Sequence, residues 1–106
     1  MSNLDLRPQQ RFLMAIEQAV REANRDVLAP LLGKITTDNF VPLMVAVAKA
    51  RGAYLSHAAH IADDKKDPDP AAIQKLRDLR LAYEELLAAA QALEHAIERG
   101  YLDVGK

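Results

Sequence analysis

The stretch that follows Pro70 constrains the fold more than any other part of the chain. About thirty residues, as far as Arg99, contain neither glycine nor proline and are rich in Ala, Leu, Glu, Arg and Gln, which favour helix. Apolar residues recur along the stretch at alternating spacings of three and four, which is typical of a helix with one apolar seam. β-Branched and aromatic residues, which strands prefer, are scarce, so we expect an all-α chain. The seam comprises Leu76, Leu79, Tyr83, Leu86, Ala90, Leu93 and Ile97.

Both ends of this helix, residues 70–99, carry recognisable signals. Asp69 is a suitable N-cap, because its carboxylate can accept hydrogen bonds from the open amides of the first turn. Pro70 suits the first helical position. Gly100 suits the left-handed conformation that commonly follows a helix, and Tyr101 can then fold back on the last turn.

Two further helices are expected, over residues 8–28 and 39–62. The first should end before Pro30, because the residue that precedes a proline avoids helical geometry. The second should start so that Pro42 falls in its first turn, which makes Asn39 or Asp38 the N-cap. The linker at 31–36 is apolar for a loop and should pack on the helices.

The second helix has apolar residues over more than half of its circumference. One seam runs through Phe40, Leu43, Val47, Ala50, Tyr54, His57 and Ile61, and another face holds Val41, Met44, Ala48, Leu55, Ala59 and Ala62. A helix of this kind is covered on more than one side. Because the loops are short, we expect an antiparallel three-helix bundle in one domain, residues 1–106, with flexible ends at 1–7 and 103–106.

One chain offers few helices to cover these faces, so we also expect a homodimer that forms a larger helical bundle. Val41, Val45, Leu55 and Leu81 would otherwise form an exposed apolar patch. Small residues on the third helix would let another helix approach closely. They are Ala82, Ala89 and Ala96, at intervals of seven residues. In a dimer with a two-fold axis, the apolar patch and the small residues of one chain would each pack against the same residues of the partner chain.

Composition and motifs exclude several classes of function. Net charge is −1 with both signs mixed, and even the basic region of Lys65, Lys66, Lys75, Arg77 and Arg80 is interleaved with aspartates, so we expect a solvated surface and neither nucleic-acid nor membrane binding. No cysteine is present, the serines are Ser2 and Ser56 only, and no glycine-rich loop precedes a helix. The polar first residues lack the apolar run of a signal peptide. We therefore expect a cytoplasmic protein that is not an enzyme.

The histidines suggest a metal site only superficially. His57 and His60 are three residues apart, but His95 lies near the other end of the third helix. The Glu-x-x-His pattern of di-iron bundles and the His-Glu-x-x-His motif are both absent. We expect no metal and no cofactor, and we take His57 as an ordinary seam residue.

Arg51 is the polar residue whose position is least expected, because it falls within the apolar arc of the second helix. A buried guanidinium needs a carboxylate, and the loop lengths place Glu17 and Glu84 within a turn of it. Alternatively its stem packs while its head reaches water. A third possibility is a ligand-binding cluster formed with Tyr54 and His57.

The sequence thus favours a non-enzymatic helical module for protein–protein interaction or assembly, because apolar helix surface is the only feature present in excess. The alternative is a small-ligand-binding regulatory bundle that uses Arg51, Tyr54 and His57. A cavity lined by these residues would favour the alternative.

Overall fold

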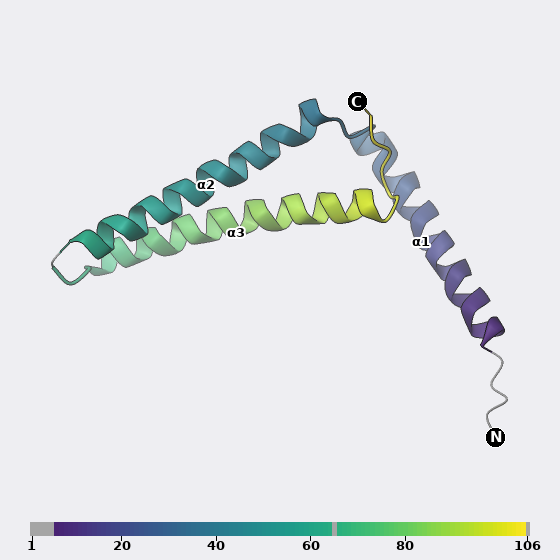
Figure 1. The fold of residues 1–106 in the computed structure, drawn as a ribbon, viewed down its shortest axis with the longest axis horizontal. Helices are drawn as coiled ribbons and strands as arrows, with labels where there is room; N and C mark the ends of the chain where they lie inside the picture. The colour runs from purple at the N-terminus through teal and green to yellow at the C-terminus, as the bar shows by residue number, and fades with distance from the viewer. Residues whose placement is uncertain (1–5, 65, 106) are drawn as a thin grey trace, which may run out of the picture. The chain divides into compact units, whose positions relative to one another are not determined.

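The computed structural model describes residues 6–64 and 66–105. Three helices account for most of them: α1 is Arg7–Leu32, α2 is Thr37–Asp63 and α3 is Pro70–Glu98 (Figure 1). Within these described ranges there is no strand, only an isolated β-bridge between Ile35 and Val104. The all-α class with three helices is confirmed. The closed antiparallel bundle stays a prediction, as do its dimerisation and the single domain.

The chain divides into two compact units, Met1–Ile35 with Ala96–Lys106, and Thr36–His95. In the second unit α2 and α3 lie side by side (Figure 1). His57 on α2 contacts Ala72 on α3, whereas the earlier Arg51 contacts the later Tyr83, so the two helices run in opposite directions. Val47 and Ala90, each 1% exposed, are the most buried residues of the seam between them.

The predicted seams of both helices are confirmed in this unit, because every seam residue is buried or half-buried. On α2 these residues are Phe40, Leu43, Val47, Ala50, Tyr54, His57 and Ile61, and on α3 they are Leu76, Leu79, Tyr83, Leu86, Ala90 and Leu93.

The start of α2 differs from the prediction. The N-cap is Thr36, whose hydroxyl accepts a hydrogen bond from the Asn39 amide, while the Asn39 side-chain oxygen accepts one from the Thr36 amide. Asn39 is therefore the third helical residue of a capping box rather than the cap. Pro42 lies inside the helix and beyond its first turn, where it removes one intrahelical hydrogen bond.

The end of α1 was also predicted wrongly, because the helix continues through Pro30 to Leu32. Pro30 falls in the last turn, so its missing amide costs a single hydrogen bond. The Ala29 carbonyl still accepts from the Gly33 amide at 2.8 Å. Gly33 ends the helix with a φ of 62°, a conformation that glycine adopts without steric cost.

Both ends of α3 match the prediction closely. The Asp69 carboxylate accepts a hydrogen bond from the Ala72 amide at 2.7 Å, and Pro70 is the first helical residue. After Glu98, Gly100 has a φ of 76°, its amide donates to Ile97 O at 3.0 Å, and the Tyr101 amide donates to Ala96 O at 2.8 Å. This is the Schellman arrangement of a helix C-terminus.

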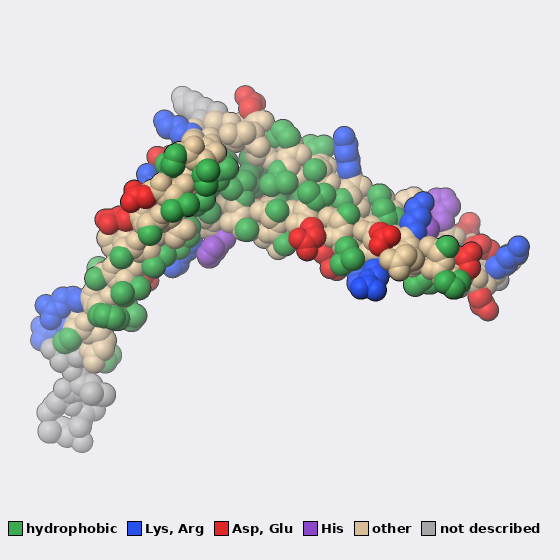
Figure 2. Space-filling model, turned by 180° about the vertical axis from the view of Figure 1, so that it is seen from behind, with side chains coloured by type: hydrophobic (Ala, Val, Ile, Leu, Met, Phe, Trp, Pro, Cys, Tyr) green, Lys and Arg blue, Asp and Glu red, His purple; other side chains and the backbone are tan. Residues whose placement is uncertain are grey.

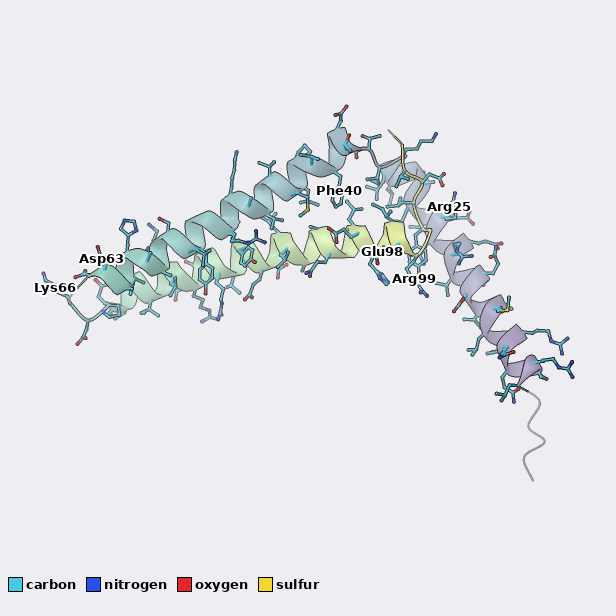
Figure 3. The ribbon with its side chains drawn as sticks, in the orientation of Figure 1. Arg25, Phe40, Asp63, Lys66, Glu98 and Arg99 are labelled. Atoms are coloured by element: carbon cyan, nitrogen blue, oxygen red, sulfur yellow. The ribbon has the colours of Figure 1, made fainter. Side chains whose placement is uncertain are left out.

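In the first unit, α1 is joined to the C-terminal segment, residues 99–105. Arg25 donates to Gly100 O at 2.9 Å and to the Asp103 carboxylate at 2.7 Å, and it is labelled beside this segment in Figure 3. Ile35 pairs with the segment through two backbone hydrogen bonds. Ile35 and Leu102 are buried, at 8% and 5% exposure. Residues 1–7 and 103–106 were predicted to be flexible ends. Residues 1–5 and 106 lie outside the described residues, whereas Arg7 already begins α1, and Asp103 and Gly105 form the backbone hydrogen bonds to Ile35.

Candidate functional site

Arg51 lies in the second unit with an exposed side chain, and its contacts are aromatic. Its Nε donates a hydrogen bond to the Tyr83 hydroxyl at 3.2 Å, and its guanidinium carbon is 5.3 Å from the centre of the Tyr83 ring. The distance to the ring falls within the range of a cation–π interaction. Arg51 thus joins α2 to α3 through its guanidinium group, and the side chain as a whole is exposed.

Tyr54 belongs to the same group of side chains. It follows Arg51 by three residues on α2, and its ring stacks on Tyr83 with centres 6.2 Å apart and an angle of 20° between the planes. The structure therefore brings Arg51 and Tyr54 together, as predicted, but it does so through Tyr83. The sequence placed Tyr83 in the seam and gave it no further role. Its hydroxyl could have indicated such a role in the sequence, because a tyrosine in a seam needs a polar partner for that group.

The carboxylates expected to hold Arg51 have other positions. Glu84 contacts Arg80, one turn before it on α3, at 3.7 Å. Glu17 is a residue of α1 and belongs to the other unit, so its position gives no information about the surroundings of Arg51. Among the described residues of its own unit, Arg51 forms no ion pair. Neither structural alternative describes Arg51 fully, because the side chain is exposed and its guanidinium contacts the Tyr83 ring and hydroxyl.

His57 is half-buried and belongs to the contact between the helices rather than to the arginine–tyrosine group. Its Nε2 is 2.9 Å from the Ala72 carbonyl in the first turn of α3, so the ring N–H donates to that oxygen. His60 makes a similar bond to Ser56 O at 2.7 Å. Within the described ranges there is no group of three or more His, Cys, Asp or Glu side chains that could hold a metal ion.

A surface pocket of about 200 Å³ adjoins Tyr54 within the second unit. Ile73 and Leu76 form its apolar part, and Arg77 and Arg80 add two guanidinium groups from the same helix. The sequence assigned both arginines to a solvated basic region. Arg77 and Arg80 are three residues apart, and Leu76 is beside them, so both lie on the side of α3 that borders the seam. This position could have been recognised in the sequence.

Except for Ala96, which belongs to the first unit, the predicted interface residues lie in the second unit and are exposed. Val41 is 51% exposed, Val45 44%, Leu55 55% and Leu81 41%. Ala82 and Ala89 are exposed as well. Along α2 the exposed small and apolar positions form a continuous line, here called the outer stripe, whose spacings alternate between four and three. Its members are Val41, Val45, Ala48, Gly52, Leu55, Ala59 and Ala62.

The first unit also exposes apolar side chains. No residue of α1 is buried, although this helix is strongly amphipathic. The hydrophobic side chains on its surface are visible in Figure 2. Phe12 is 64% exposed, Leu13 59%, Ile16 47%, Val20 41% and Val27 60%. Several large apolar side chains of α1 are therefore uncovered in the structure.

Comparisons with protein-family models, curated proteins and solved structures gave no match to this chain. In the part of the chain that the structure describes, none of the helices combines the length and the apolar character that crossing a membrane requires. A functional assignment therefore has to come from the chain's own surfaces.

Proposed function

We propose that this chain is a non-enzymatic helical module for protein–protein interaction that assembles as a homodimer, with the outer stripe of α2 at the interface. The observation that carries the proposal is Gly52, which lies in the middle of a helix of 27 residues. The sequence reasoning did not single this glycine out. A lone glycine within a helical pattern could have been recognised in the sequence as a position with a packing or functional reason.

Gly52 weakens its own helix without any compensating contact in the structure. Glycine in a helix interior costs about 1 kcal/mol relative to alanine. Its φ is not positive, and nothing lies within 4 Å of the position that a Cβ atom would occupy. Backbone conformation and internal packing therefore give no reason for a glycine here. A second backbone that approaches α2 closely at this point would give one.

The pattern of sizes along the outer stripe supports such an approach. Ala48, Gly52 and Ala59 are small, whereas the larger Val41, Val45 and Leu55 are 44–55% exposed. A two-fold axis near Gly52 would place one stripe against its own copy, so that the same residues serve both sides. The exposed apolar side chains of α1, from Phe12 to Val27, would be covered in the same assembly if each chain closes an antiparallel three-helix bundle and two such bundles pair.

Size exclusion coupled to light scattering tests the proposal over a dilution series. We expect the mass of two chains at micromolar concentration. Gly52→Leu should shift the mass toward one chain, because a leucine keeps the backbones apart. Ser56→Leu is the matched control, since Ser56 is also exposed on α2 but lies outside the outer stripe. This control should remain dimeric.

Gly52→Ala gives a second test, because the effect of the added methyl group differs according to whether a partner backbone lies at this position. If a partner backbone lies against Gly52, the added methyl weakens the dimer. Without a partner, the methyl only raises helix stability, by about 1 kcal/mol, and leaves the mass unchanged. A mass of one chain at all concentrations for the parent protein, or a Gly52→Leu variant that stays dimeric, would contradict the proposal.

A further inference from the structure

The pocket beside Tyr54 has one wall, the Tyr54 ring, whose position is determined by contacts with other side chains. The Tyr54 ring is held against Tyr83 by stacking, and Tyr83 is in turn held by the hydrogen bond from Arg51. Ile73 and Leu76 complete an apolar wall on α3. A volume of about 200 Å³ is enough for one aromatic ring, since an engineered cavity of roughly 150 Å³ accepts benzene.

Charge is distributed unevenly around this pocket. Arg77 and Arg80 line it from neighbouring positions on α3, and like charges three residues apart on a helix repel each other. Arg80 has a single contact with Glu84 at 3.7 Å, and Arg77 forms no ion pair or hydrogen bond with the other described residues. The closest acidic residue in sequence, Asp78, accepts a hydrogen bond from Gln74 at 2.9 Å. The charge of Arg77 therefore has no partner among the described residues of the unit, and that of Arg80 has one exposed partner, Glu84.

The geometry points to a binding site for a small aromatic anion, a single ring that carries a carboxylate. The ring lies against Tyr54, Ile73 and Leu76, and the carboxylate accepts hydrogen bonds from Arg77 and Arg80. Guanidinium groups suit this role because their planar fork matches the two oxygens of a carboxylate. The apolar wall and the two charges act together, so neither half of the ligand is sufficient alone.

Titration of the full-length protein with benzoate, followed by NMR of the tyrosine rings, tests the inference. Tyr54 is assigned by comparison with a Tyr54→Phe variant. We expect saturable shifts of the Tyr54 signals with a dissociation constant of about 1–10 mM, as suits a ligand of this size. Acetate, which has the charge but no ring, and benzyl alcohol, which has the ring but no charge, should each bind at least roughly fivefold more weakly.

A double variant, Arg77→Gln with Arg80→Gln, should weaken benzoate binding roughly tenfold. Lys75→Gln is the control, because Lys75 is on the same helix but lines a different groove. It should change binding less than about twofold. Arg77→Lys with Arg80→Lys keeps the charge, loses the fork and should fall between the two. Benzyl alcohol that binds as tightly as benzoate, a double glutamine variant equal to Lys75→Gln, or the absence of saturation would each overturn the inference.

Discussion

In the second unit α2 and α3 meet along an apolar seam, whereas in the first unit α1 is joined to the C-terminal segment largely by polar contacts. Val47 and Ala90 are 1% exposed, and the seam extends from them along both helices. Among the described residues of the first unit, Ile35 and Leu102 are buried, and the other links include backbone hydrogen bonds and side-chain bonds from Arg21 and Arg25. The first unit thus depends on interactions that water competes for.

This difference implies different local stabilities. Burying apolar surface contributes about 25 cal/mol per Å², and the long seam sums many such contributions. A salt bridge between partly exposed groups typically contributes only about 0.2–1 kcal/mol. Arg25 and Asp103 are 41% and 58% exposed, so their pair belongs to this weak class. We therefore expect the C-terminal segment to open more readily than the contact between α2 and α3.

The largest expected effect is in the second unit. Val47→Asp places a charge in the centre of the seam with no partner, which typically costs about 3–5 kcal/mol. Ser56→Asp adds the same charge to the same helix at an exposed position, and it should cost less than about 0.5 kcal/mol. Thermal unfolding followed by circular dichroism at equal chain concentration measures both. Equal melting temperatures for the two variants would show that the seam does not hold this unit together.

The contrast between the units also explains what the sequence could predict. The seam depends on a repeat of three and four along each helix, and such a repeat is a local property of the sequence. The residues of both seams were therefore identified correctly, from Phe40 to Ile61 and from Leu76 to Leu93. The tie in the first unit joins Arg25 to Asp103 across 78 positions, and no local pattern signals a contact of that kind.

Helix ends were predictable where one residue type dominates the geometry. Asp69 and Gly100 fulfilled their expected roles because a capping carboxylate and a left-handed glycine have few substitutes. Thr36 and Pro30 were misjudged for the opposite reason. Several residues between Thr36 and Asn39 are of types that can cap a helix, so the sequence does not single out one of them. Proline destabilises a helix less near its end, because few hydrogen bonds are lost there.

The candidate site was predicted only in part. Arg51 and Tyr54 were selected because a cation and an aromatic ring occur within an apolar arc, and they do share a contact. That contact is Tyr83, on the other helix, and the pocket adds Arg77 and Arg80. Finding these partners requires the exact register between α2 and α3, which loop length alone sets only to within about a turn.

A smaller effect is expected at the boundary between α3 and the C-terminal segment. Gly100→Ala forces alanine to a φ of 76°, which costs roughly 1–2 kcal/mol. The new Cβ would lie 3.4 Å from Arg21 Nε, which can move aside, so the backbone sets the cost. Amide exchange at Ile35 and Gly105, whose amides bond across the bridge, should accelerate roughly 5–30-fold. Gly52→Ala is the control, because the φ of Gly52 is not positive and nothing lies within 4 Å of its Cβ position, and exchange at Ile35 and Gly105 should match the parent. Unchanged exchange in Gly100→Ala would mean that the segment does not depend on this turn.

The smallest effect tests the polar tie itself. Arg25→Met removes the ion pair with Asp103 and the hydrogen bond to Gly100 O but keeps an apolar stem of similar length. Because both groups are partly exposed, we expect a loss of about 1 kcal/mol, seen as roughly fivefold faster amide exchange at Ile35 and Gly105. Arg11→Met is the matched control on the exposed surface of α1 and should leave this exchange unchanged. A double-mutant cycle with Asp103→Asn isolates the ion pair, for which we expect a coupling of about 0.2–1 kcal/mol. A coupling of zero with unchanged exchange would show that Ile35 and Leu102 hold the segment by burial, and the contrast between the two units would then be one of extent rather than of kind.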